Sequence, residues 1–157
     1  MSSAPSDVRV RRPQEHERLM KELQEEGGFG TFRDILILAA AIGFYYSRRV
    51  TFSESAGDPI RYETLTGRAF SEALINMIAA NVVKDDPEIM DWMRVEERLS
   101  IFEEFANGGL EYIQEQVNVR HQTADLVVAD LVSEALSDSS GASPASVDEL
   151  LSGISTW

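Results

Sequence analysis

The sequence predicts a mostly helical α+β domain that begins with a short strand. Between residues 15 and 136, most apolar side chains recur at the three- and four-residue spacing of helices. Residues 8–12 differ, because valine and arginine alternate there as in a strand with two unlike faces. Glycine and proline interrupt these segments, as expected of turns. With 157 residues, the chain is long enough for one compact core and a tail.

Composition divides the chain into four expected parts. Residues 1–6 form a polar leader that lacks the apolar stretch of a signal peptide. Residues 7–136 form a single, mostly helical domain. Residues 137–146 are rich in serine, glycine, alanine and proline, which predicts a flexible linker. Residues 147–157 form a short amphipathic tail.

The first third of the domain, residues 7–49, predicts a strand followed by two helices. Pro13 ends the strand and suits the first turn of a helix that extends to Glu26. After a glycine-rich break at residues 27–30, Thr31 is a good N-cap for a second helix that ends near Tyr46. That helix is apolar nearly all round, so we expect it to be buried in a core or a dimer interface. Its small residues, Ala39, Ala40, Ala41 and Gly43, would let another helix approach closely.

The rest of the domain predicts a short extended segment and four more helices. A turn is expected at residues 57–59, followed by a strand with alternating Ile60, Tyr62 and Thr64. The expected helices cover residues 67–83, 87–93, 96–117 and 123–136. The first of them has Phe70, Leu74, Ile75 and Ile78 on its expected buried stripe. In the third, Gly108 and Gly109 should weaken or kink the helix.

The strand–helix–helix order of residues 7–49 is typical of ribbon-helix-helix DNA-binding proteins. In those proteins, two copies of the strand pair in the major groove and their side chains read the bases. Arg9 and Arg11 would take that role here. The amides at the start of the second helix, around Thr31 and Phe32, would hold a phosphate with help from Arg33 or Arg12. The alternative is that residues 8–10 pair with the strand at residues 60–64 inside one subunit.

Charge is distributed unevenly along the chain. The net charge is −13, but residues 1–49 hold eight Arg and Lys against seven Asp and Glu. Residues 50–157 hold six against twenty. This imbalance argues against non-specific coating of nucleic acid and leaves room for a local basic face at the N-terminal unit. The acidic remainder would either meet a basic partner or serve as a solvated surface.

Catalytic and metal sites are not supported by the sequence. The absence of cysteine excludes disulfides, thiolate catalysis and cysteine-based metal sites. The two histidines, His16 and His121, have no evident carboxylate partner, and we expect His16 to be solvated. Glu97, Glu104, Glu111 and Glu115 recur at helical spacing and suit an exposed acidic stripe rather than a metal site. We therefore expect no enzyme activity, no metal and no cofactor, and we interpret Trp92, Phe102, Phe105 and Tyr112 as core residues.

The tail carries apolar residues on a helical stripe. These residues are Leu150, Leu151, Ile154 and Trp157. A short acidic amphipathic segment beyond a linker often docks into a groove of a partner protein. The alternative is that it folds back onto its own domain or frays.

Several motifs together resemble the protein 4 family associated with bacterial DNA phosphorothioation (dnd) systems. They are VRRP at 10–13, FRDI at 32–35, AAAIGF at 39–44, PIRY at 59–62, ALIN at 73–76 and IFEEFANGGL at 101–110. The resemblance covers about residues 8–117. It implies a setting in bacterial defence, where such systems replace a backbone oxygen of DNA by sulfur and partner proteins restrict unmarked DNA. The resemblance implies an accessory component of such a system, and it implies no catalytic residues in this chain.

These observations lead to two functional hypotheses. The first is a non-enzymatic DNA-binding or assembly subunit of a phosphorothioation-linked restriction system, which contacts DNA through Arg9, Arg11, Arg12, Thr31 and Arg33. It would act as a homo-oligomer or with other subunits of the system. The second is an acidic adaptor that binds a partner through its C-terminal tail without contacting DNA. The longest apolar run, residues 35–46, is too short to span a bilayer, so we expect a cytoplasmic protein.

Overall fold

A computed structural model describes residues 8–142 of the chain. Two strands, β1 (Arg9–Pro13) and β2 (Ser55–Arg61), form one small antiparallel sheet. The α-helices are α1 (Glu17–Glu26), α2 (Phe32–Tyr45), α3 (Tyr62–Leu65), α4 (Ala69–Val82), α5 (Val95–Arg120) and α6 (Ala124–Ala142). Short 3-10 helices are η1 (Gln14–His16), η2 (Pro87–Met90) and η3 (Trp92–Arg94). The expected mostly helical α+β class is confirmed.

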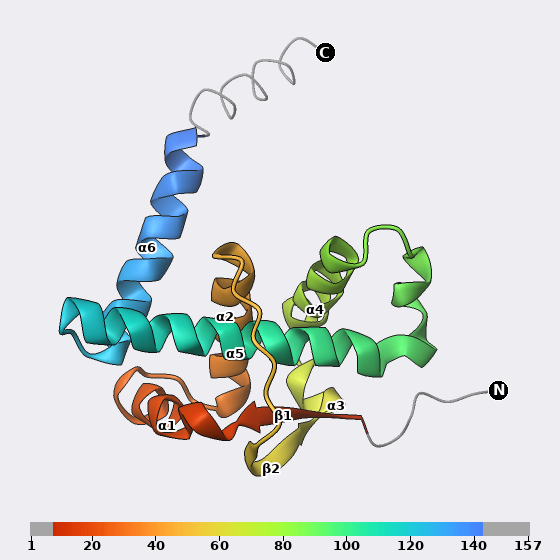
Figure 1. Ribbon diagram of the computed structural model, residues 1–157, viewed down its shortest axis with the longest axis horizontal. Coiled ribbons are helices and arrows are strands. Elements are labelled where there is room, and N and C mark those ends of the chain that lie inside the picture. The colour runs from red at the N-terminus through yellow and green to blue at the C-terminus, as the bar shows by residue number, and fades with distance from the viewer. Residues whose placement is uncertain (1–7, 143–157) are drawn as a thin grey trace.

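The long helix α5 is the centre of the fold. It runs across the whole molecule, and α1, α2, α4, α6 and the sheet are arranged around it (Figure 1). Its apolar side packs into the core, where Phe102 and Leu110 are fully buried. The other large buried side chains include Met20, Leu23, Ile35, Leu36, Ile75, Ile78 and Ile113. One continuous apolar core therefore joins all the helices of the described residues that contact α5.

Helix α2 begins where the sequence predicts. The hydroxyl of Thr31 accepts a hydrogen bond from the main-chain N–H of Asp34 at 3.3 Å, which confirms Thr31 as the N-cap. The expectation that this apolar helix is buried is confirmed for the side that packs on α5. There, a Cβ at Gly109 would collide with the carbonyl oxygen of Ala39, and one at Gly43 with the carbonyl oxygen of Phe105. The small residues therefore allow the two backbones to touch.

Gly108 and Gly109 do not interrupt α5, contrary to the expected weak point. The helix is continuous from Val95 to Arg120. Both glycines are buried, and close tertiary contacts hold the helix at this point. Tertiary packing thus outweighs the low helix propensity of glycine.

The sheet forms within one chain, as the alternative to the ribbon-helix-helix prediction requires. Arg9 lies opposite Arg61, and Arg12 lies opposite Ala56. One residue, Arg11, separates Val10 from Arg12, whereas three residues, 57–59, separate their partners Ile60 and Ala56. The strand β2 therefore bulges at residues 57–59, where a turn was predicted. The predicted strand through Tyr62 and Thr64 is wrong, since residues 62–65 form α3.

Several other expectations are corrected. Phe70 is not buried in α4: it is 57% exposed, and Ser71, Ile75, Ile78 and Ala79 form the buried stripe instead. Trp92, expected in the core, is 38% exposed. His16, expected to be solvated, is buried. Helix α6 continues through residues 137–142, where a flexible linker was expected.

The predicted leader, residues 1–6, and the tail residues Leu150, Leu151, Ile154 and Trp157 lie outside the described residues. Within residues 8–142, no helix is long and apolar enough to cross a membrane.

Candidate functional site

Arg11, one of the two arginines of β1 that were expected to read DNA bases, forms an ion pair with Glu103 of α5. Its guanidinium contacts Glu103 at 3.0 Å, and its main-chain N–H donates to the same carboxylate at 2.6 Å. The hydrogen bond with Glu103 raises the pKa of Arg11, and the Glu103 side chain is only 6% exposed. Because Glu103 also takes the main-chain N–H, that group is not available to the strand of a second copy. The pairing of two β1 strands is therefore opposed by the geometry.

Arg12 and Arg33 also have internal partners. Arg12 is buried, and its guanidinium lies over the ring of Phe32, 4.0 Å from the ring centroid. Arg33 donates to the main-chain carbonyl of Thr64 at 3.3 Å and so connects the start of α2 to α3. Thr31 caps α2 as described above. These three predicted DNA contacts hold the N-terminal unit together.

Arg9 is the exposed arginine of β1. It lies directly opposite Arg61, which is also exposed, so the two cations share one face of the hairpin. On the side toward α5, Arg9 and Arg11 line a shallow pocket of about 420 Å³ together with Glu96, Ser100 and Glu103. The face that remains for DNA therefore carries both signs of charge.

The predicted acidic stripe of α5 is largely paired with arginines. Arg48 contacts Glu115 at 2.6 Å and Glu111 at 3.2 Å, and Arg49 contacts Glu104 at 2.6 Å. The stripe therefore fastens the segment after α2 to α5, rather than facing solvent alone. Within residues 8–142, no group of three or more histidine, aspartate or glutamate side chains could hold a metal ion.

An apolar groove between α2 and α4 is an exposed feature that the sequence reasoning missed. It has a volume of about 670 Å³. The residues that line it are Asp34, Ile37, Leu38 and Ala41 of α2, Arg68 at the start of α4, and Phe70, Ala73, Leu74 and Met77 of α4. Phe70 is 57% and Met77 43% exposed, so the wall on α4 is open to solvent. Phe70, Leu74 and Met77 recur at helical spacing beside the buried stripe, which is the signal that could have revealed a second apolar face.

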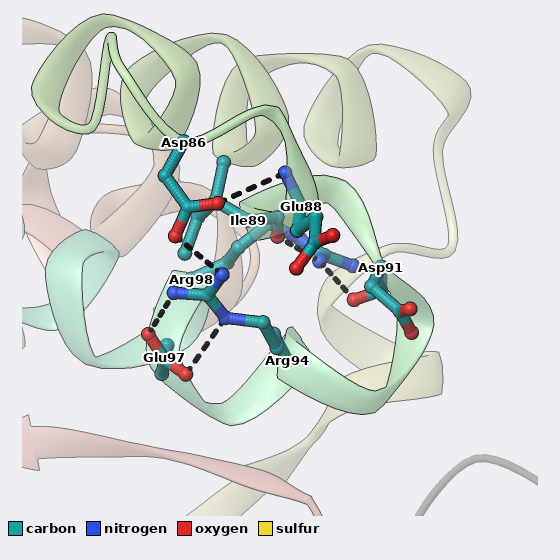
Figure 2. Close-up of polar contacts among 7 residues, drawn as sticks. All are labelled: Asp86, Glu88, Ile89, Asp91, Arg94, Glu97 and Arg98. Atoms are coloured by element: carbon teal, nitrogen blue, oxygen red, sulfur yellow. Dashed lines mark hydrogen bonds and ion pairs between the residues drawn. The ribbon is translucent and has the colours of Figure 1, made fainter.

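A second exposed apolar group lies on the turn that precedes α5. Met90, Trp92 and Met93 are all at least 38% exposed there. Figure 2 shows how the turn is fixed: Arg94 contacts Asp86 at 2.6 Å and Glu97 at 2.8 Å. The hydrogen bonds from Arg94 lower the pKa of both carboxyls. These contacts hold the turn in place without covering its apolar side chains.

Comparisons with known proteins place this fold in a family. No curated protein and no solved structure matches the chain. The sequence model of the family described as DNA sulphur modification system-associated protein 4 matches residues 9–148. That range includes both strands, all the helices of the described residues, the arginine contacts and the groove. This chain therefore belongs to the DNA sulphur modification system-associated protein 4 family.

Proposed function

We propose that this protein is a non-catalytic assembly subunit of a DNA sulphur modification system, which binds another protein of that system through the groove between α2 and α4. The family links the chain to such a system. The observation that supports an assembly role is the groove itself, whose apolar wall of Phe70, Leu74 and Met77 stays open although the core beneath it is complete.

The groove has the shape and chemistry of a protein contact. Exposed aromatic and methionine side chains are enriched at the centres of protein interfaces. Residues of two helices, α2 and α4, form its walls, and an apolar groove between helices can accept the apolar face of a third helix. Full burial of a side chain of this kind contributes about 1.5–3 kcal/mol, and because Phe70 is 57% exposed, roughly half of that remains available for binding. The expected occupant is therefore an amphipathic helix of another subunit.

Co-expression with the other proteins of the same system tests this proposal. Phe70→Asp combined with Met77→Asp places two charges on the wall of the groove. We expect at least about ten-fold weaker retention of the partner, which corresponds to about 1.4 kcal/mol. Leu136→Asp is the matched control, because Leu136 is equally apolar and 63% exposed but lies on α6. Equal retention by the groove variant and the control, with unchanged circular dichroism, would refute the proposal.

Contact with DNA through the β1–β2 hairpin is a second candidate function. The exposed cross-strand pair Arg9 and Arg61 favours it. Of the residues predicted from the sequence, Arg9 is the best placed, whereas Arg11, Arg12, Thr31 and Arg33 would contribute mainly by holding the hairpin and α2 in place.

Binding to duplex DNA over a series of salt concentrations tests this candidate, with and without phosphorothioate in the duplex. Arg9→Ala with Arg61→Ala should weaken binding and flatten its salt dependence. Arg18→Ala is the control, because its side chain is 93% exposed on α1. An unchanged salt slope in the double variant would eliminate the hairpin as the contact.

A further inference from the structure

A second cleft, separate from the groove, opens between α3, α4 and the turn that precedes α5. It has a volume of about 200 Å³. Tyr62 and Glu63 come from α3, Glu72 from α4, and Trp92 and Val95 from the turn and the start of α5; Val8 and Arg98 complete the lining. None of these residues lines the groove between α2 and α4.

The cleft carries two exposed carboxylates, Glu63 and Glu72. Neither side chain has a hydrogen bond or an ion pair with any residue of the described range 8–142. By contrast, Glu97, Glu104 and Glu134 are each paired with an arginine. Burial, and next the negative charge of Glu72, raise the pKa of Tyr62, so Glu72 lies close to the phenol. The carboxylates and the aromatic ring thus belong to one site.

The one cation in the lining, Arg98, already has hydrogen-bond partners in the protein. Arg98 is 6% exposed, and its Nη1 donates to the main-chain carbonyls of Ile89 at 2.6 Å and of Asp91 at 2.8 Å (Figure 2). Its guanidinium also lies at the phenol of Tyr62, where its charge and its hydrogen bond act to lower the pKa of Tyr62 and so oppose burial and Glu72, which raise it. Arg98 is therefore already engaged inside the protein, and the two glutamates are the exposed ionic groups of the lining.

The backbone that carries Trp92 is held in place by hydrogen bonds of its neighbours. The carboxylate of Asp91 accepts the main-chain N–H of Met93 at 2.8 Å, and Arg94 joins Asp86 to Glu97. These contacts lie on both sides of Trp92 in the chain and hold its backbone. A segment whose backbone is already ordered loses less conformational entropy on binding, which favours contact with a ligand.

We propose that this cleft binds an arginine side chain of a partner protein, with the guanidinium against Trp92 and Tyr62 and paired with Glu63 and Glu72. An aromatic face attracts a cation, and a carboxylate adds charge-assisted hydrogen bonds. Arginine fits better than lysine because its planar guanidinium both stacks and bonds in a fork. The net charge of −13 would draw a basic partner toward this surface. The inference rests on the proposed assembly function in taking the partner to be a protein of the same system.

Titration of the full chain with N-acetyl-arginine amide tests the cleft without any partner. Trp157→Phe leaves Trp92 as the single tryptophan, because the sequence holds two. We expect a saturable change in Trp92 fluorescence with the arginine amide. The neutral isostere N-acetyl-citrulline amide should bind at least about ten-fold more weakly, the loss of one charge-assisted pair. Equal responses to the two amides would overturn the inference.

Variants of the carboxylates locate the binding. Glu72→Gln and Glu63→Gln should each weaken binding of the arginine amide by about ten-fold. Glu88→Gln is the matched control, since Glu88 is an exposed acid of the neighbouring turn that does not line the cleft. Equal affinities in all three variants would overturn the inference, as would dimerisation of the chain in place of amide binding.

The partner assay separates the two proposals. Glu72→Gln should weaken retention of the co-expressed partner by about ten-fold, which the amide titration predicts independently. If groove variants release the partner and Glu72→Gln has no effect, the cleft inference fails and the assembly function stands. If the arginine amide binds as expected but groove variants keep the partner, the groove proposal fails and the cleft stands.

Discussion

Helix α2 has two apolar faces that are used in opposite ways. Toward α5, the small residues Ala39 and Gly43 bring the two backbones into contact, and the interface is closed. Toward α4, the larger Leu38 and Ile37 form the floor of a groove whose wall includes the exposed Phe70. The face toward α5 is closely packed, whereas the face toward α4 leaves apolar side chains exposed to solvent.

This difference shows that apolar composition alone does not tell whether a helix face packs inside the protein or stays exposed. The closed face depends on residues without bulk, because only they allow carbonyl oxygens to approach a neighbouring backbone. The open face depends on bulky side chains, such as Phe70 and Met77, that the rest of the described residues leave about half exposed. We therefore expect substitutions on the closed face to change folding and substitutions on the open face to change binding.

The largest effect is expected where α2 meets α5. Gly109→Ala adds a methyl group that collides with the main-chain carbonyl of Ala39, and a backbone atom cannot move aside cheaply. We expect a loss of about 3 kcal/mol in the free energy of unfolding, measured with urea. Gly30→Ala is the control, because nothing lies within 4 Å of the added Cβ. A loss below about 1 kcal/mol would contradict the close-contact account.

The contact between β1 and α5 comes next. Arg11→Ala leaves the nearly buried carboxylate of Glu103 without its cation. Breaking a fully buried pair costs about 3–5 kcal/mol, but the Arg11 side chain is 41% exposed, so we expect a smaller loss of about 2 kcal/mol. Arg18→Ala, on the surface, should change stability by less than about 0.5 kcal/mol. Similar unfolding curves for both variants would show that Glu103 is solvated in the folded protein.

The sequence predicted these elements unevenly, for physical reasons. Local signals predicted well: the Thr31 cap, the glycine break before it and the apolar character of α2 depend on neighbouring residues. The contact that engages Arg11 depends on Glu103, 92 residues away in the chain, and no local pattern shows such a contact. Phe70 was assigned to the core because α4 is apolar on more than one side, and only packing decides which side faces inward.

Substitutions in the groove should leave stability unchanged and so sharpen the contrast with the closed face. Phe70→Ser with Met77→Ser removes apolar side chains that are already about half exposed. We expect the free energy of unfolding to change by no more than about 0.5 kcal/mol. Ile75→Ala, on the buried stripe of the same helix, should cost about 2–5 kcal/mol. Large losses in both variants would mean that the groove belongs to the core.

The smallest effect concerns His16, which precedes α1 and is buried, although the sequence suggested a solvated position. Burial lowers the pKa of His16 against the opposing charges of Glu15 and Glu111, and its Nε2 has no hydrogen-bond partner within the described residues. Below the ordinary histidine pKa of about 6.5, the unfolded chain therefore binds more protons at His16 than the folded chain does. His16 thus has no effect on the free energy of unfolding well above that pH, and it lowers this free energy as the pH drops through about 6.5. Urea unfolding at about pH 7.5 and pH 5.5 should show this loss, and His16→Gln should reduce it because glutamine does not titrate in that range. An unchanged difference between the two pH values in His16→Gln would assign the effect to other groups.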